Sequence, residues 1–260
     1  MSKILKAQAK IGVIGGTGLY EIEGLTHIKK VNIGTPFGDP SDTIVIGKLN
    51  NVSIAFLPRH GRGHRILPSE LPSRANIYAL KSIGVEYIIG VNSCGSLKEE
   101  IRPGTLVIPD QIIDCTKGRI STFFGNGIAA HISFAEPFCT DLIQVLYTTT
   151  IDTGASIRKG GTFIVMDGPA FSTRAESKLY RSWSADIIGM TVLPEAKLAR
   201  EAEICYASIA CVTDYDCWHP THESVTIDLV ISYLTKNIEN AKKYSPSLLK
   251  TIDAVNNFSP

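Results

Sequence analysis

The chain has 260 residues, and 44% of them are hydrophobic, which is enough apolar material for a substantial globular core. The formal net charge is +1, a balance that argues against a protein that binds nucleic acid or an anionic membrane surface. Lys3, Lys6 and Lys10 interrupt the apolar stretches at the N-terminus, so no signal-peptide core forms, and no later run is long enough to cross a bilayer. We therefore expect a cytoplasmic protein that acts on small molecules and folds as a single domain over residues 1–260.

An apolar run at 11–14 ends in a glycine loop, Gly15-Gly16-Thr17-Gly18. Glycines permit positive φ angles and carry no Cβ, so successive backbone N–H groups can converge on an anion, and the Thr17 hydroxyl adds a donor. The loop therefore suits a phosphate group. A dinucleotide loop would need a third glycine where Glu21 stands, and a P-loop would need a Gly-Lys-Ser/Thr sequence. A tight turn without a ligand explains this loop equally well when it is considered alone.

Strand-like and helix-like segments alternate along the rest of the chain, without low-complexity linkers or an internal repeat. This pattern predicts an α/β fold in which a mixed, twisted β-sheet is flanked by helices. We expect strands at 43–46, 52–57, 85–91, 106–113, 162–166, 187–190 and 204–212. We expect helices at 72–83, 142–150, 172–183, from 194 onward, and at 225–242.

The strand at 52–57 opens into a basic corner that runs from Arg59 to Arg65 and also contains two histidines. Ligands of open α/β sheets collect at strand ends, and the arginine fork matches phosphate oxygens. We predict a binding role for Arg59 and His60, the first residues after the strand. Arg62 and Arg65 fit a solvated basic loop better. No metal site is predicted.

A second loop of small residues is predicted after the strand at 85–91, where Asn92, Ser93 and Cys94 begin a run with several hydroxyls. Two such loops, each following a buried strand, can hold one oxyanion between them. Cys94 is expected to be a small packed side chain and not a nucleophile, because the chain offers no acyl-transfer constellation around it.

A long polar segment runs from Gly118 to His131. A single histidine in a glycine-rich loop is more often a surface residue than a catalyst. However, an excursion of this length in a compact domain often covers a site or a subunit contact. His131 is therefore kept as a candidate.

Further candidates follow the strands predicted at 162–166 and 187–190. Phe171 and Ser172 come after the first strand, and Met190 and Thr191 end the second. Glu176 follows near the first turn of the next helix, so Ser172 or Thr173 could cap that helix. For Ser172, capping and ligand contact compete evenly.

The most informative motif is Thr213-Asp214-Tyr215-Asp216-Cys217-Trp218, at the end of an apolar strand. Two carboxylates at the mouth of a buried strand, beside aromatic residues, lie where desolvation and mutual repulsion raise a pKa. We predict that one of Asp214 and Asp216 holds a proton at neutral pH. A solvated turn is the alternative, but Tyr215 and Trp218 would be unusual on a bare turn.

The six cysteines contain no Cys-x-x-Cys pair. This spacing fits reduced thiols in the core and implies no zinc site, although a thermophilic protein could cross-link some of them.

Taken in order, the motifs resemble the trimeric purine nucleoside phosphorylase family, and within it the members that act on methylthioadenosine. The resemblance spans nearly the whole chain. The shared motifs, in addition to the glycine loop, are Thr35-Pro36-Phe37-Gly38, Arg59-His60-Gly61, Cys94-Gly95-Ser96, Ala135-Glu136-Pro137-Phe138, Gly168-Pro169, Phe171-Ser172, Met190-Thr191, Pro194-Glu195 and Thr213-Asp214-Tyr215-Asp216.

The resemblance implies phosphorolysis of methylthioadenosine to adenine and methylthioribose 1-phosphate by a homotrimer, with inorganic phosphate as co-substrate and no metal or organic cofactor. Asp214 would donate to the purine, with Asp216, Phe171 and Ser172 near the base, and Met190 would lie against the ribose. His131 would reach the 5′ end from a neighbouring subunit. The phosphate would bind Thr17, Arg59, His60, Asn92, Ser93 and Thr191. The methylthio group would meet Ile227, Val230 and Ile231, which share one face of the helix at 225–242 and otherwise pack in the core.

The chain departs from the family pattern at three positions. Asn92 and Ser93 replace the common Thr and Ala, and Gly189 stands where an Asn usually precedes the Met-Thr pair. A phosphorylase of 6-oxopurine nucleosides or methylthioinosine would share the fold, but would be expected to carry Asn at position 214. A dinucleotide-dependent oxidoreductase fails on the missing glycine. A non-catalytic purine-binding module would keep the pocket without the chemistry.

Overall fold

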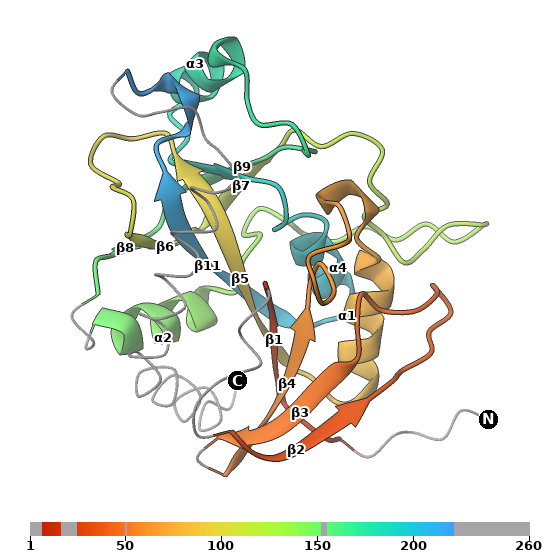
Figure 1. Ribbon diagram of the computed structural model, residues 1–260. Helices are drawn as coiled ribbons and strands as arrows, with labels where there is room; N and C mark the ends of the chain where they lie inside the picture. Colours follow the sequence, from red (N-terminus) through yellow and green to blue (C-terminus); the bar gives the residue numbers. More distant parts are fainter. Residues whose placement is uncertain (1–6, 17–24, 50, 152–154, 221–260) are drawn as a thin grey trace.

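The computed structural model describes residues 7–16, 25–49, 51–151 and 155–220. Two groups of predicted site residues lie outside these ranges: Thr17 of the glycine loop, and Ile227, Val230 and Ile231 with the helix predicted for them. Figure 1 shows one twisted sheet with helices on both sides of it.

The described strands form one eleven-stranded mixed sheet. The main path runs β2-β3-β4-β1-β5-β10-β9-β7, and β11, β6 and β8 branch from β5. The strands on the path are β1 (Ile11–Gly15), β2 (Thr26–Val31), β3 (Ile44–Leu49), β4 (Val52–Pro58), β5 (Tyr87–Ser96), β7 (Gln111–Asp114), β9 (Thr162–Val165) and β10 (Ile187–Gly189). The branch strands are β6 (Leu106–Ile108), β8 (Ile157–Lys159) and β11 (Cys205–Asp214).

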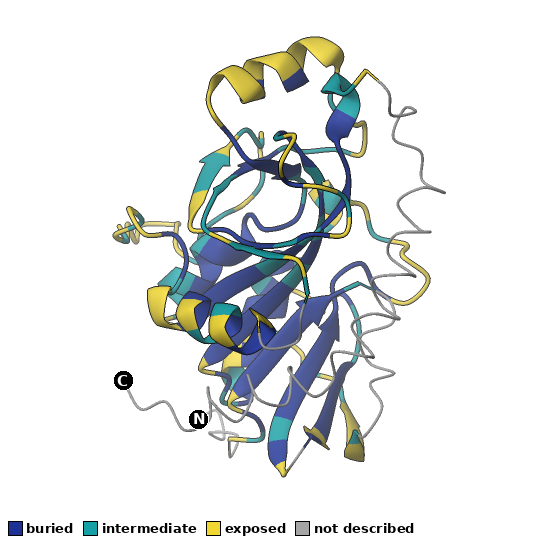
Figure 2. Cartoon of the chain, turned by 90° about the vertical axis from the view of Figure 1, so that its left-hand side faces the viewer, coloured by how far each residue is buried: buried dark blue, intermediate teal, exposed yellow. Residues whose placement is uncertain are grey.

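The centre of the sheet consists of four parallel strands. β5 pairs with β1 on one side and with β11 on the other, and β1 pairs with β4. The register places Gly90 of β5 opposite Ile14 and opposite Ser208. These strands are almost continuously apolar and buried, as expected for parallel strands covered on both faces (Figure 2). Because they are parallel, their carboxyl ends meet at one edge of the sheet.

The helices cover the sheet unequally. In Figure 1, α1 and α4 lie side by side on one face, α2 lies on the other, and α3 stands apart at the top. α3 is mostly exposed (Figure 2). Their bounds are α1 (Ser73–Ser82), α2 (Thr140–Ile151), α3 (Arg174–Ser182) and α4 (Glu195–Glu201), with short 3₁₀ turns η1 (Pro68–Glu70) and η2 (Asp216–Trp218).

Several predicted element ends are confirmed. α1 stops before Gly84, whose φ of 93° is a conformation that glycine adopts without strain. α3 is capped by Thr173, which accepts a hydrogen bond from the N–H of Glu176 while the Glu176 carboxylate accepts from the N–H of Thr173. Thr173, and not Ser172, is therefore the capping residue.

The loop predicted at 92–96 is wrong. β5 continues to Ser96 because these residues keep their pairing with β11, from Asn92 opposite Ala210 to Gly95 opposite Asp214. Small polar residues signal a loop in sequence, but a central strand with neighbours on both sides satisfies their backbone groups equally well. The sheet thus extends into the candidate site.

One further strand prediction is corrected, and the structure has two strands that were not predicted. The strand expected at 106–113 is divided at Pro109 into β6 and β7, which pair with different partners. β2 and β8 were not predicted. β2 is a largely exposed edge strand and β8 is very short, so neither carries a strong apolar pattern.

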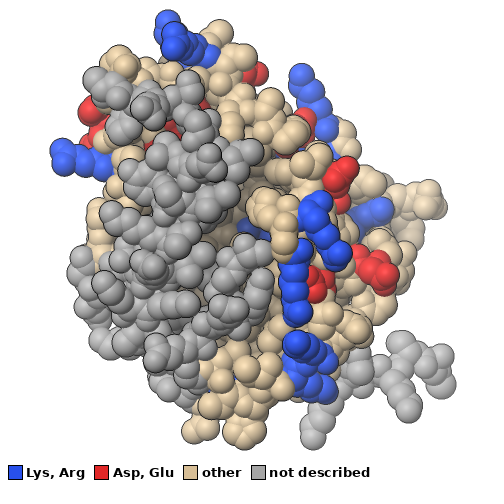
Figure 3. Space-filling model, viewed as in Figure 1, with Lys and Arg blue, Asp and Glu red and all other residues tan. Residues whose placement is uncertain are grey.

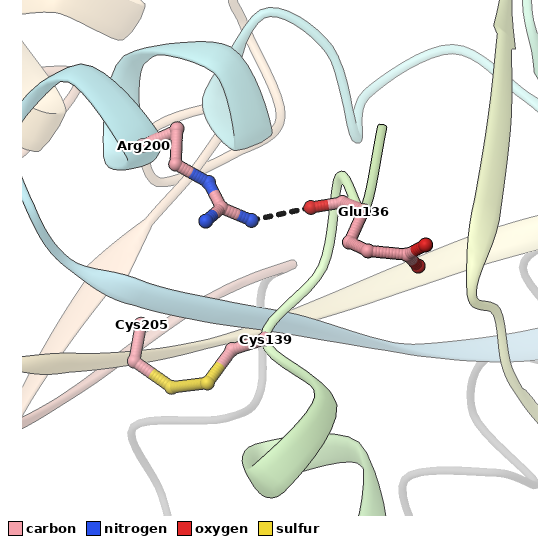
Figure 4. The surroundings of a disulfide bond; sticks show 4 residues. All are labelled: Glu136, Cys139, Arg200 and Cys205. Carbon is pink, nitrogen blue, oxygen red and sulfur yellow. Dashed lines mark hydrogen bonds between the residues drawn. A yellow bond between two sulfur atoms is a disulfide. The ribbon is translucent and has the colours of Figure 1, made fainter. Parts of the chain in front are cut away.

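The expectation of reduced cysteines is also wrong for one pair. Cys139 and Cys205 form a disulfide with a Cα–Cα distance of 5.3 Å across a sequence separation of 66 (Figure 4). The bond joins the segment before α2 to the start of β11, and Arg200 of α4 donates to the Glu136 carbonyl beside it. Sequence spacing could not reveal this pair, because only the fold brings the two positions together.

Surface features complete the description. Among the described residues, no helix is both long enough and apolar enough to cross a membrane. Within the same ranges, no three His, Cys, Asp or Glu side chains gather as a metal site would require. The face shown in Figure 3 carries Lys and Arg interspersed with Asp and Glu among neutral residues.

Candidate active site

The candidate site lies at the carboxyl edge of the central strands. β1 pairs with β4 and with β5 in the same direction. The sheet therefore holds Gly15, Pro58 and Val91 at neighbouring levels along these strands. Asp214 emerges farther along, opposite Gly95 of β5. The edge therefore has a near end, beside the glycine loop and the basic corner, and a far end at the two aspartates.

At the near end, Arg59 is buried, and most of its N–H bonds donate to groups of the protein. Its Nε and Nη2 donate to the two carboxylate oxygens of Glu195 at 2.6 and 3.0 Å, a bidentate pair. Nη1 donates to the Val91 carbonyl at 2.7 Å, and Nη2 also reaches the Ile14 carbonyl at 3.2 Å. Among the described residues, one N–H bond of Nη1 is left for a ligand.

His60 is buried next to Arg59, and its ring stacks on that of His64. Its Nδ1 lies 2.8 Å from the Ile66 carbonyl, which can only accept, so Nδ1 carries the hydrogen and Nε2 is an acceptor in the neutral ring. Burial lowers the pKa of His60 to about 4, with a further contribution from the Arg59 charge. The ring is therefore neutral near pH 7.

Asn92 and Thr191 are brought together from different strands. β10 runs antiparallel to β5, so the residues after Gly189 continue alongside Ser93 and Asn92. The Asn92 amide lies 2.7 Å from the Thr191 hydroxyl. Because the Gly90 carbonyl, 3.2 Å from the other end of the amide, can only accept, the amide nitrogen belongs on that side and the oxygen faces Thr191.

Asp214 and Asp216 lie at the far end, and both are buried. Oδ2 of Asp214 accepts from the Thr213 hydroxyl, and Oδ1 accepts from the backbone N–H of Asp216, each at 2.7 Å. Asp216 has a φ of 48°, and its Oδ2 has no hydrogen-bond partner in the described ranges. Burial raises the pKa of Asp216, against the opposing effect of the Ser177 hydroxyl. The second carboxyl is thus the one whose environment favours a proton.

Comparisons with known proteins identify the family to which the chain belongs. The family model described as "Phosphorylase superfamily" matches residues 10–252. The chain belongs to this superfamily. It is 56% identical to a protein of Geobacter sulfurreducens named S-methyl-5′-thioadenosine phosphorylase, over 95% of this chain and 87% of that protein. A protein of the same name from Thermosynechococcus vestitus is 54% identical, over 95% and 86% respectively.

Solved structures agree with the family match. A methylthioadenosine phosphorylase from an antarctic soil metagenomic library has a TM-score of 0.91 and 50% identity, covering 98% of this chain and 89% of that chain. A single-residue mutant of the adenosine/methylthioadenosine phosphorylase of Schistosoma mansoni, in complex with methylthioadenosine, has a TM-score of 0.89 and 36% identity, covering 96% and 93%. The predicted fold class and the family resemblance are confirmed.

Other predicted residues of this phosphorylase lie around the same edge. Phe171 is exposed, and Ser172 is half-buried with its hydroxyl 3.6 Å from the Met166 sulfur. Met190 packs against Gly168, where an added Cβ would come within 2.3 Å of its sulfur. A close contact also explains the glycine at position 189, because a Cβ there would lie 2.9 Å from the Phe163 ring. An Asn at position 189 therefore cannot fit unless that ring moves.

His131 lies apart from these residues within one chain of the phosphorylase. It is exposed and lines a hollow of about 400 Å³ with Phe124, Ile128 and residues of α4. Ile120, Phe124 and Ile128 of the same segment are exposed apolar side chains. The structure does not bring His131 to the aspartates of its own chain.

Two residues of the candidate site were not predicted from the sequence. Glu195 was assigned only to a helix start, because nothing local shows that its carboxylate is buried against Arg59. Arg119 was included in a polar loop, yet its five N–H bonds reach Asp167 and the carbonyls of Met166, Met190 and Leu193. Its position between two predicted strand ends was not visible in the sequence.

Proposed function

We propose that the protein catalyses the phosphorolysis of S-methyl-5′-thioadenosine, which yields adenine and 5-methylthioribose 1-phosphate. Relatives more than half identical carry that activity in their names, and one related structure holds methylthioadenosine. The observation that carries the proposal is the pair of polar clusters at the two ends of one strand edge, Asn92 with Thr191 and Asp214 with Asp216.

The separation of these clusters suits a nucleoside. Asn92 and Gly95, which marks the level of Asp214, are three residues apart on β5, or about 10 Å at the rise of a β-strand. A ribose with a purine can lie along this edge, with its anomeric carbon toward the first cluster and its base toward the second. Phosphate and a proton donor then act on opposite sides of the bond that breaks.

In the proposed reaction, a phosphate oxygen forms a bond to C1′ of the ribose while the bond from C1′ to N9 of the purine breaks. The bonding electrons pass to the purine, and a proton neutralises its N7. Positive charge develops on the ribose and negative charge on the base, so both ends of the site bind the transition state more strongly than the substrate. Asp214 hydrogen-bonds N7, and the proton that it shares with Asp216 is the one transferred.

The phosphate end is assigned to Thr17, Arg59, His60, Asn92, Ser93 and Thr191. The remaining Nη1–H of Arg59 donates to one oxygen. Nε2 of the neutral His60 ring accepts from the hydroxyl of a protonated phosphate. The burial of Arg59 and His60 and the directions of their ring and guanidinium nitrogens support these contacts. We therefore expect the replacement of Arg59 to weaken mainly the binding of phosphate.

The remaining contacts concern the sugar and its 5′ substituent. Met190 lies against the ribose, with Phe171 and Ser172 near the base, while Ile227, Val230 and Ile231 receive the methylthio group. We propose a homotrimer in which His131 of one subunit closes this pocket in the next. The exposed apolar side chains beside His131 support a subunit contact there. Sedimentation that shows an active monomer would contradict the trimer.

The proposal also includes domain organisation, location and cofactor use. Residues 1–260 fold as one domain in the cytoplasm, and phosphate is the only co-substrate, without a metal or organic cofactor. A single cooperative unfolding transition, recovery in the cytoplasmic fraction, and full activity after treatment with a chelator are the expected results.

The deciding experiment measures free adenine from methylthioadenosine with and without phosphate. Phosphate-dependent release of adenine together with methylthioribose 1-phosphate is expected. Equal release in phosphate-free buffer would point to a hydrolase, and binding without release would point to a non-catalytic purine-binding module. A clear preference for methylthioinosine or inosine would favour the 6-oxopurine alternative.

A further inference from the structure

A buried chain of polar groups leads away from the phosphate end of the site. Tyr206 of β11 donates its hydroxyl hydrogen to Oε2 of Glu195 at 3.0 Å, and both oxygens of Glu195 accept from Arg59. The three residues are only 2, 1 and 2% exposed, respectively. Tyr206 lies in β11, Glu195 begins α4 and Arg59 directly follows β4, so the chain of polar groups joins three parts of the fold.

We propose that Glu195 and Tyr206 are positioning residues for phosphate, which they serve by fixing the direction of the Arg59 N–H bond that the described residues leave for a ligand. The proposal rests on the proposed function, because it takes phosphate as the ligand of Arg59. Two oxygens of Glu195 hold Nε and Nη2, and the Val91 carbonyl holds one hydrogen of Nη1. The plane of the guanidinium is therefore set, and its last hydrogen points in one direction.

Tyr206 is itself held firmly. An added Cβ at Gly90 would lie 2.3 Å from the Tyr206 oxygen, so glycine makes the space that the hydroxyl fills. The Tyr206 carbonyl accepts from the N–H of Cys139 at 2.8 Å, and the neighbouring Cys205 is bonded to Cys139. A hydroxyl fixed in this way can fix the carboxylate that it contacts.

The direction of the Arg59 N–H bond matters because the phosphate end does not rely on net positive charge to select its ligand. The Glu195 carboxylate offsets the Arg59 charge, and burial keeps the neighbouring His60 neutral near pH 7. The described part of the phosphate end therefore offers oriented donors and little net positive charge. Binding by oriented donors is sensitive to small angular errors, whereas binding by net charge is not.

The test compares Tyr206→Phe with Tyr87→Phe, using methylthioadenosine and inorganic phosphate as the probes. Tyr87 is a matched control: it is buried, it lies opposite Cys205 in the sheet register, and it belongs to neither cluster of the site. Tyr206→Phe should raise the KM for phosphate about threefold to tenfold, the usual effect of one lost hydrogen bond. The KM for methylthioadenosine and kcat at saturating phosphate should stay within about twofold of the parent.

Glu195→Gln should raise the KM for phosphate further, because the amide nitrogen cannot accept from Arg59. If Glu195→Gln does not fold, Tyr206→Phe still decides. An unchanged KM for phosphate in Tyr206→Phe, an equal rise in Tyr87→Phe, or a fall of that KM in Glu195→Gln would overturn the positioning role. Turnover by the parent without phosphate would instead contradict the proposed function, so the two failures are distinguishable.

Discussion

The backbone N–H of Asp216 donates to Oδ1 of Asp214 at 2.7 Å, so the second aspartate fixes the first. The Thr213 hydroxyl occupies the other oxygen, which gives both oxygens of Asp214 a donor from the protein. Asp216 receives less support, and burial raises its pKa. Asp214 is therefore held in a defined direction, and Asp216 is the carboxyl whose environment favours a proton.

Asp214→Asn is expected to lower kcat on methylthioadenosine, because the amide cannot take part in the shared proton that reaches N7. The parent should prefer adenine substrates by roughly tenfold to a few hundredfold in kcat/KM, since a mispaired buried polar group costs about 1 to 3 kcal/mol. The variant should narrow this gap, because a neutral amide does not repel the 6-oxo group. Measured kcat/KM values for methylthioadenosine, adenosine and inosine check both statements, and a parent that prefers inosine would show that the base end is misassigned.

His60 provides a prediction about pH. Its folded pKa of about 4 lies below the ordinary value of 6.5, so the unfolded chain binds this proton first as the pH falls. The contribution of His60 to stability is complete above pH 6.5 and is lost as the pH falls toward 4. His60→Asn keeps a donor for the Ile66 carbonyl but does not titrate, so its unfolding free energy should decrease less between pH 7 and pH 5 than that of the parent.

Chemical denaturation at several pH values provides the measurement. His64→Asn serves as a comparison, because burial also lowers the pKa of His64, but less of that ring is enclosed. Parallel pH profiles for the parent and His60→Asn would contradict the prediction.

The sequence predicted the parts of the fold that depend on local pattern. The apolar runs of β1, β4, β5 and β11 and the glycine after α1 are read directly from residue order. The polar strand ends at Arg59 and Asp214 followed from the rule that parallel strands end at one edge. These patterns were sufficient to predict that the two polar clusters lie at one edge of the sheet.

Contacts between distant segments could not be predicted in this way. Glu195 is 136 residues from Arg59, and Cys205 is 66 residues from Cys139. Neither pair leaves a periodic or spacing signal, because each depends on the packing of whole elements. The small residues at 92–96 indicated a loop for a related reason, since their pairing partner is more than 100 residues away.

The disulfide gives a prediction about stability. Replacing both Cys139 and Cys205 with Ser should lower the unfolding free energy by about 2 to 4 kcal/mol, because the bond closes a long loop in the unfolded chain. The parent should lose a similar amount in the presence of a reductant, whereas the variant should be insensitive to it. Cys115→Ser is the control, since Cys115 is a free thiol. A parent whose stability does not respond to complete reduction would contradict this expectation.

Arg119 gives the last prediction, and it concerns how the long loop supports the site. Its side chain is 5% exposed, and its N–H groups hold Asp167 on one side and the carbonyls of Met190 and Leu193, which flank Thr191, on the other. Arg119→Met fills similar space but leaves these acceptors unpaired, so the unfolding free energy should fall by about 3 to 5 kcal/mol. The KM for phosphate should also rise, because Thr191 loses its anchored neighbours. Lys10→Met, which removes an exposed cation whose partner Glu86 is also exposed, should cost no more than about 1 kcal/mol and leave that KM unchanged. Denaturation curves and phosphate titrations of both variants provide the comparison, and equal losses of stability would mean that Arg119 has no special role in holding the site.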